Sequence, residues 1–167
     1  MSSWEASGKS DEWYTPRYVF DALGCRFDLY PAGPQTGGHV PATVTYFGAG
    51  GLEKDWYGFV WMNPPFGGRN GIAPWLAKFF RHGDGIALTP DRTSAPWFQE
   101  YAPKASALLF VAPKIKFERP DGSVGRSPGC GTVLMAAGPR GRAILFRAGR
   151  LGLVALPNLG AEMQAAA

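Results

Sequence analysis

Residues 60–68, Val-Trp-Met-Asn-Pro-Pro-Phe-Gly-Gly, constrain the fold more than any other stretch of this 167-residue chain. The apolar residues 60–62 favour the end of a buried strand. Pro64 and Pro65 have no N–H to donate to a sheet ladder, so the strand must end there. Each proline also drives the residue before it toward an extended backbone. The stretch therefore predicts a rigid turn at the carboxyl end of a strand, where open α/β sheets bind ligands.

This turn combines two hydrogen-bond acceptors with an aromatic ring. The side-chain oxygen of Asn63 and the carbonyl of Pro64 can each accept one hydrogen of an exocyclic amine, which directs the amine lone pair at an electrophilic methyl group. Phe66 can stack on a base, a contact worth about 1–3 kcal/mol. Asn63, Pro64, Pro65 and Phe66 are therefore the candidate catalytic residues. The same pattern is also typical of a plain strand-ending turn with a core aromatic.

The composition is that of an ordinary globular protein, because 46% of the residues are hydrophobic and 18% are charged. No apolar run is long enough to cross a membrane, and residues 1–10 lack the apolar segment of a signal peptide. Cys25 and Cys130 do not have the spacing of metal ligands. We therefore expect no metal site and reduced thiols in a cytoplasmic protein, with a disulfide between them as the alternative.

The positive charge of the chain is unevenly distributed along the sequence. Residues 101–150 hold nine Lys or Arg against two acidic residues, whereas the rest of the chain holds eight against eleven. A one-sided basic surface suits a polyanion such as nucleic acid. A solvated basic face explains the same pattern equally well.

The order of expected elements predicts one compact α/β domain over residues 11–157, between a disordered leader at 1–10 and a frayed tail at 158–167. Helices are expected at residues 17–23, 74–82 and 97–101, with Thr15 as the N-cap of the first. Strands are expected at residues 27–30, 44–47, 59–62, 86–89, 107–111, 114–117, 132–136 and 143–146. Strands alternate with helices up to residue 111 and dominate afterwards, which predicts a mostly parallel sheet with an antiparallel edge hairpin.

The connecting segments carry further expectations. Pro31 is expected to stop the strand that begins at residue 27, and residues 47–51 are expected to form a flexible loop. Residues 140–142 are expected to form a hairpin-like turn. The polar residues at strand ends, Asp28, Asn63 and the pair Asp91-Arg92, are expected to converge on one edge of the sheet.

Beyond these local patterns, the chain resembles a known family, the phage-type DNA N6-adenine methyltransferases. The likeness covers residues 11–136 and rests on blocks that follow in the family's order. The blocks are Glu12-Trp13-Tyr14-Thr15-Pro16, Phe27-Asp28-Leu29-Tyr30-Pro31-Ala32, Gly51-Leu52 with Trp56, the stretch at 60–66, Leu88-Thr89-Pro90-Asp91-Arg92-Thr93 with Trp97-Phe98, and Ile115-Lys116-Phe117.

This resemblance implies a Rossmann-like methyltransferase fold, S-adenosylmethionine as cofactor, and methyl transfer to the N6 amine of adenine in DNA. It implies catalytic roles for residues 63–66 and cofactor contacts for Tyr14, Thr15, Pro16, Asp28, Tyr30 and Pro31. The chain departs from the family at Tyr30, where a second acid is usual; a phenol exchanges hydrogen bonds but brings no negative charge.

The resemblance also implies DNA as the partner, with the target base flipped out of the duplex or already single-stranded. Basic residues in the expected loops and on one face of the expected strand at 114–117 are candidate DNA contacts; they are Arg92, Lys114, Lys116, Arg119 and Arg126, with Arg140 and Arg142 in the expected turn. A phage- or prophage-encoded protein of this family works in the cytoplasm of a bacterial host.

Other functions fit the same turn. Methylation of the N4 amine of cytosine needs the same two acceptors, and methylation of RNA or of a protein amide would not require the basic loops. A catalytically inactive DNA-binding relative is consistent with Tyr30 and with the basic carboxyl-terminal third.

Overall fold

Seven strands form one mixed sheet in the computed structural model, which describes residues 13–35, 37–64 and 71–157. Their order across the sheet is β2-β1-β3-β4-β6-β5-β7. The strands are β1 (Phe27–Gly33), β2 (Ala42–Phe47), β3 (Val60–Met62), β4 (Gly85–Pro90), β5 (Ala107–Val111), β6 (Thr132–Ala137) and β7 (Gly152–Ala155). The α/β class is therefore confirmed, while the expected leader at 1–10 and tail at 158–167 lie outside the described residues.

The sheet has a parallel half and an antiparallel half. Strands β2, β1, β3 and β4 run parallel to one another. Strand β6 is antiparallel to both β4 and β5, and β7 is antiparallel to β5. Because β4 and β5 both oppose β6, they point the same way, so their carboxyl ends lie at the same edge as those of β1 and β3.

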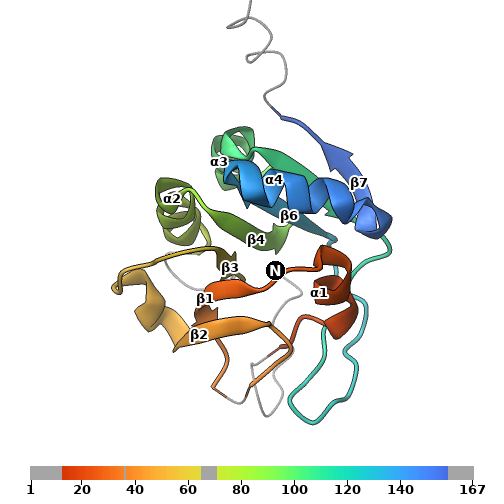
Figure 1. Cartoon of the computed structure of the whole chain (residues 1–167). Helices are drawn as coiled ribbons and strands as arrows, with labels where there is room; N and C mark the ends of the chain where they lie inside the picture. The colour runs from red at the N-terminus through yellow and green to blue at the C-terminus, as the bar shows by residue number, and fades with distance from the viewer. Residues whose placement is uncertain (1–12, 36, 65–70, 158–167) are drawn as a thin grey trace, which may run out of the picture.

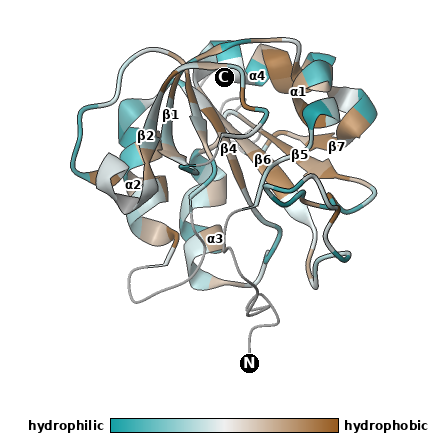
Figure 2. Cartoon of the chain, turned by 90° about the horizontal axis from the view of Figure 1, so that it is seen from below, coloured by the Kyte–Doolittle hydropathy of each residue, from teal (hydrophilic) through white to brown (hydrophobic). Residues whose placement is uncertain are grey.

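The helices cover both faces of this sheet. Helices α1 (Arg17–Leu23) and α4 (Gly138–Arg147) pack against each other on one face, and α2 (Ala73–His82) and α3 (Pro96–Tyr101) pack together on the other (Figure 2). Short 3-10 helices follow β2, α3 and α4; they are η1 (Gly48–Leu52), η2 (Ala102–Lys104) and η3 (Gly149–Leu151). The loops after β1 (orange) and after β5 (teal) lie on the same lower side of the sheet in Figure 1.

Aromatic residues at the start of the parallel half hold the layers together. Trp61 of β3 is fully buried, and its ring meets Phe20 of α1 edge-on at a centroid distance of 4.9 Å. Phe27 and Phe59 stack beside it at 5.2 Å. Burying each of these side chains contributes about 1.5–3 kcal/mol, which fixes α1 and β1 against β3.

Helix α1 begins as expected at residue 17, but Thr15 is not its N-cap. Pro16 takes the N-cap position, and no side chain caps the helix. Gly24 ends the helix in the left-handed conformation with φ 59°, a backbone region that glycine adopts without strain. The hydroxyl of Thr15 is instead buried and directed to another partner, described below.

Strand β1 continues through Pro31 to Gly33, so the expectation that Pro31 stops it is wrong. The pairing with β2 shifts register between Tyr30 and Gly33. A bulge of this kind accepts a residue without an N–H, since that residue is not needed in the ladder. The carboxyl end of β1 therefore lies three residues later than the sequence indicated.

Four other expectations are wrong. Residues 140–147 belong to helix α4 and not to a turn and a strand. The antiparallel part contains β7, for which no strand was expected, in place of an edge hairpin. Residues 114–117 pair with no named strand, although their side chains alternate between exposed and buried. Residues 48–52 form η1 and not a flexible loop.

Within the described ranges, no helix combines the length and the hydropathy needed to cross a membrane.

Candidate functional site

The carboxyl ends of β1 and β3 meet at a point where the strand order reverses. Leu29 of β1 pairs with Val44 of β2 on one side and with Val60 of β3 on the other, and all three strands are parallel. The chain thus leaves β1 in one direction and returns on its opposite side. In open α/β sheets the crevice outside the carboxyl ends at such a reversal is the usual ligand site. Asn63 follows β3 directly at this position.

The amide of Asn63 is held by two buried hydroxyl groups. Its Nδ2 donates to Oγ1 of Thr15 at 3.4 Å, near the long limit for a hydrogen bond. Its side chain also hydrogen-bonds the phenol of Tyr30. Thr15 is 3% exposed and Tyr30 is 5% exposed, so both partners are fixed by packing. The amide therefore keeps one orientation at the end of β3.

Tyr30 is uncharged in this position. Burial raises the pKa of its phenol well above the ordinary value of 10.0, and the hydrogen bond with Asn63 offsets part of that rise. A neutral phenol can donate one hydrogen bond and accept others. The group next to Asn63 is thus a polar but electrically neutral one.

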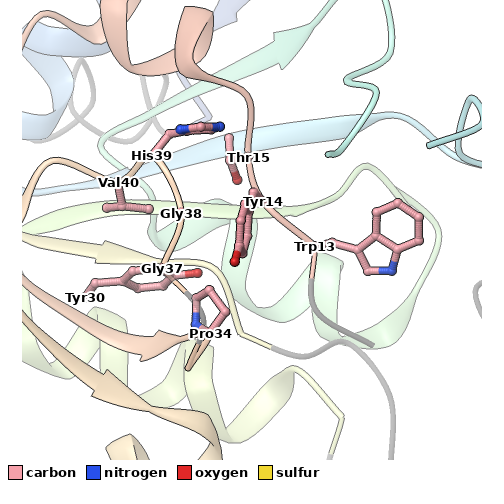
Figure 3. Close-up of a pocket in the computed structure, with 9 residues that line it drawn as sticks. All are labelled: Trp13, Tyr14, Thr15, Tyr30, Pro34, Gly37, Gly38, His39 and Val40. Atoms are coloured by element: carbon pink, nitrogen blue, oxygen red, sulfur yellow. The ribbon is translucent and has the colours of Figure 1, made fainter. Parts of the chain in front are cut away.

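A hollow of about 280 Å³ opens beside Tyr30, between the ends of β1 and β2. We call it the β1–β2 hollow. Its walls combine aromatic, small, apolar and uncharged polar residues: Tyr30, Pro34, Gln35, Gly37, Gly38, Val40, Thr45 and Phe47. A smaller cavity adjoins it, where the rings of Tyr14 and Tyr30 approach from the segment before α1 and from β1 (Figure 3). Tyr30 lines both spaces and also contacts Asn63, so it joins the hollow to the end of β3.

Glu118 ties three segments together at this edge. Its backbone exchanges two hydrogen bonds with Tyr14, at 2.8 and 3.0 Å. Its carboxylate lies 2.7 Å from Nε2 of His39, whose ring packs edge-on against Tyr14. The segments at 13–16, 37–40 and 117–125 are therefore locked to one another. Sequence reasoning missed His39 and Glu118, because no local pattern pairs residues so distant along the chain.

Asp28 does not belong to this edge, which corrects the expected convergence. It is the second residue of β1, exposed, and level with Phe59 just before β3 begins. Its Oδ2 accepts the backbone N–H of Phe59 at 2.7 Å. The carboxylate therefore joins β1 to β3 at the amino edge of the sheet, far along the strand from Asn63.

The other residues expected to contact a cofactor lie on the carboxyl side of the sheet. Tyr14, Thr15 and Pro16 are buried in the segment that enters α1. Pro31 is buried in β1, and its carbonyl oxygen packs so closely on Gly51 that a Cβ there would overlap it. The turn around Asn63 and Pro64 thus shares its edge with all of these except Asp28, while Pro65 and Phe66 lie outside the described residues.

Most of the expected DNA contacts follow β4 and β5, so they share the carboxyl edge with Asn63, whereas Arg140 and Arg142 belong to α4, which follows β6. Arg92 is exposed directly after β4. Lys114 donates to the carbonyls of Pro128 and Gly129, both at 3.3 Å, and so closes the base of its own loop.

Further along this loop the three remaining candidates differ in how firmly they are held. The guanidinium of Arg119 lies 4.8 Å above the ring of Trp13 and donates to Ser123. Lys116 and Arg126 are exposed, and their side chains make no hydrogen bond, ion pair or ring contact with other described residues. Arg92, Lys116 and Arg126 are therefore the cations at this edge that remain available to a ligand.

No group of three His, Cys, Asp or Glu side chains in the described part of the chain is arranged to hold a metal ion. No model of a known protein family, no curated protein and no solved structure matches the chain. The family likeness in the sequence therefore stays a prediction, and the geometry of the carboxyl edge is the ground on which a function rests.

Proposed function

We propose that this chain is a Rossmann-like, S-adenosylmethionine-dependent methyltransferase that methylates the N6 amine of adenine in DNA. The observation that carries the proposal is the position of Asn63. It ends β3 at the reversal of strand order, and two buried hydroxyls fix its amide beside a hollow. Preorganised acceptors at such a point suit transfer to a weakly nucleophilic amine.

Asn63 and Pro64 each accept one hydrogen of the target amine. Because Nδ2 of Asn63 donates to Thr15, the opposite end of the amide, Oδ1, is the acceptor for one amine hydrogen. The carbonyl of Pro64 accepts the second, and because the Pro64-Pro65 peptide bond carries no N–H, this peptide presents an acceptor alone. The nitrogen lone pair is then free of the ring and directed away from both acceptors. The target base must leave the duplex to reach this position.

The β1–β2 hollow fits the methyl donor by its chemistry. When bound, S-adenosylmethionine supplies a methyl group on a positively charged sulfur. The aromatic faces of Tyr30 and Phe47 attract such a cation, and Val40 offers apolar contact to a nucleoside. No carboxylate lines the hollow among the described residues, so the neutral phenol of Tyr30 takes the place of an acid. Phe47 is 55% exposed and thus accessible to stack on a ring.

The test is transfer of labelled methyl groups to adenine-containing DNA. Asn63→Ala removes one acceptor and should slow transfer about 10²- to 10³-fold, the usual effect of losing one preorganised hydrogen-bonding group. Its melting temperature should stay close to that of the parent chain, because Asn63 is only half-buried. Gln99→Ala, which removes an exposed amide from α3, is the matched control and should keep full activity.

Two outcomes would count against the proposal. Equal transfer by Asn63→Ala and the parent chain would remove Asn63 from the chemistry. Label on cytosine alone, identified by mass spectrometry of the digested product, would assign the N4 amine as the acceptor.

A second function is favoured by Tyr30, which stands where an acid is expected. An inactive DNA-binding relative would bind DNA and transfer no label to DNA, RNA or protein. It would also give neither heat nor a thermal shift with millimolar S-adenosylmethionine, whereas the proposed enzyme gives both. Methyl transfer and cofactor binding together therefore distinguish the proposed enzyme from an inactive DNA-binding relative.

A further inference from the structure

Five arginines gather on the outer surface of the α1–α4 layer. They are Arg17 of α1, Arg140, Arg142 and Arg147 of α4, and Arg150 of η3, and we call this surface the arginine face. Helices α1 and α4 contact each other, and Arg150 donates to the carbonyl of Asp21 in α1 at 3.1 Å. The face is thus formed by two segments more than 100 residues apart, so the basic stretch at 101–150 indicated four of its arginines and only the fold adds Arg17 to them.

Helix α4 buries one face against the sheet and leaves Arg140 and Arg147 exposed. The buried face consists of Gly141, Ile144 and Leu145. Arg140 and Arg147 are seven positions apart, so they lie on one stripe of the helix. Phe146 is 50% exposed between them. A ten-residue helix is about 15 Å long, which sets the length of the stripe.

The arginine face accounts for the net charge of the whole chain. Its five arginines face one acid, Asp21, and the chain as a whole carries a net charge of +4. The remaining twelve basic and twelve acidic residues cancel. Arg17 and Arg147 make no ion pair within the described residues. The layer of α2 and α3 is mixed in charge, since Arg81 of α2 and Lys104 of η2 lie there with Glu100 of α3.

The arginine face reaches the candidate site at its Arg17 end, whereas at its other end the guanidinium of Arg140 lies 4.2 Å from the ring centroid of Phe59, at the amino edge of the sheet. Arg17 follows Thr15 by two residues, and Thr15 holds the amide of Asn63. A DNA duplex carries one negative charge per about 1.7 Å when both strands are counted, so a length of duplex equal to the 15 Å stripe carries about nine phosphate charges. We propose that the arginine face binds the sugar-phosphate backbone of the DNA duplex, with its Arg17 end toward the site at Asn63. This proposal rests on the proposed function for its choice of DNA, and it extends that function by locating the duplex.

The test is equilibrium binding of the full chain to a 20-base-pair duplex between about 50 and 200 mM salt, without methyl donor. The double variant Arg17→Ala with Arg147→Ala removes two phosphate contacts. The slope of log K against log salt should become shallower by about 1.8, and affinity at 100 mM salt should fall about 10- to 60-fold. The matched control is Arg81→Ala with Lys104→Ala, which removes the same charge from the opposite layer and should leave the slope unchanged.

Three results would overturn the inference. An unchanged slope in the first double variant would mean that no phosphate is lost. Equal losses in the two double variants would mean that net charge and not this face governs binding. Loss of binding to anionic lipid vesicles, with the DNA slope unchanged, would assign the face to a membrane surface. All four substituted residues are exposed, so circular dichroism should give one spectrum for all the proteins.

The salt dependence of DNA binding and the methyl-transfer assay test two different proposals, and either proposal can fail without the other. Asn63→Ala should keep the parent salt slope, because it removes no charge. If the parent chain binds DNA through the arginine face and transfers no methyl group, the surface stands and the proposed reaction falls. If methyl transfer depends on Asn63 but the two double variants bind DNA equally well, the proposed reaction stands and the arginine face is not the DNA-binding surface.

Discussion

Asp28 and Tyr30 lie two residues apart on β1, yet they serve opposite edges of the sheet. At the amino edge, Asp28 accepts the N–H of Phe59 and joins two strands. At the carboxyl edge, Tyr30 and Thr15 hold the amide of Asn63 beside an open hollow. At the amino edge, the carboxylate of Asp28 is already paired with a backbone N–H. At the carboxyl edge, the side-chain oxygen of Asn63 stays available as an acceptor for a ligand. Polar groups thus stabilise the fold at one edge and prepare a site at the other.

Both edges depend on glycines that bring backbones into contact. At the amino edge, a Cβ on Gly141 of α4 would lie 2.6 Å from the carbonyl oxygen of Gly85. At the carboxyl edge, a Cβ on Gly51 of η1 would overlap the carbonyl oxygen of Pro31. Neither obstacle is the flexible end of a side chain, so the backbone itself would have to move. The two glycines therefore test whether the edges differ in function as well as in position.

The largest effect is expected from Gly51→Ala and Gly141→Ala, each of which should lower the free energy of unfolding by about 2–3 kcal/mol. Gly51→Ala should also weaken binding of the methyl donor beyond what the loss of folded protein explains, because Pro31 adjoins Tyr30. Gly50→Ala is the control, since a Cβ there meets nothing within 4 Å. Urea denaturation and calorimetric titration check these values. If Gly51→Ala and Gly141→Ala bind the methyl donor equally well, the two edges do not differ in function.

A smaller effect should separate the two polar residues of β1. Asp28→Ala leaves the buried N–H of Phe59 unpaired and should cost about 1–2 kcal/mol of stability, with unchanged turnover per folded molecule. Tyr30→Phe keeps the ring and removes the contact to Asn63. It should lower kcat about tenfold, equivalent to about 1.4 kcal/mol, and cost less than about 1 kcal/mol of stability.

Urea denaturation and steady-state kinetics on both variants measure this contrast. If kcat falls for Asp28→Ala and not for Tyr30→Phe, the amino edge and not the carboxyl edge serves the reaction. Loss of both stability and kcat in both variants would show that β1 acts as one unit.

The sequence predicted the parallel half of the sheet well because its signals are local. Residues 60–62 are apolar and end at Asn-Pro, and β3 ends there. Pro31 misled because a proline usually ends a strand, whereas here a register shift accommodates it. That error placed the end of β1 too early and moved Asp28 to the wrong edge. A strand rises about 3.3 Å per residue, so three residues displace a side chain by about 10 Å.

The antiparallel half was predicted less well because its signals conflict. Ala143 to Phe146 read as a four-residue strand, but Gly141, Ile144, Leu145 and Ala148 are the buried positions, with helical spacing. Pro139, in the first turn of α4, was the available signal for a helix start. Residues 114–117 alternate correctly in burial but find no partner strand, and pairing cannot be deduced from one segment alone.

The smallest expected effect is a pH dependence that belongs to Tyr30. Burial raises the pKa of this phenol in the folded chain above its ordinary value of 10.0, so the folded state favours the neutral form. The resulting stability is fully present below pH 10 and declines as pH rises further, by at most about 1.4 kcal/mol per pH unit. Tyr30→Phe should remove this decline.

Tyr18 and Tyr101 also have raised pKa values through burial, but both remain in the variant, so the difference between the two stability curves reports Tyr30 alone. Urea denaturation between pH 8 and 11 measures that difference. Parallel curves would mean that the phenol is solvated in solution, and Tyr30 could then not hold Asn63 in one orientation. If the two stability curves diverge above pH 10, the phenol of Tyr30 is buried in solution. A buried phenol can hold the amide of Asn63 in the one orientation on which the proposed reaction depends.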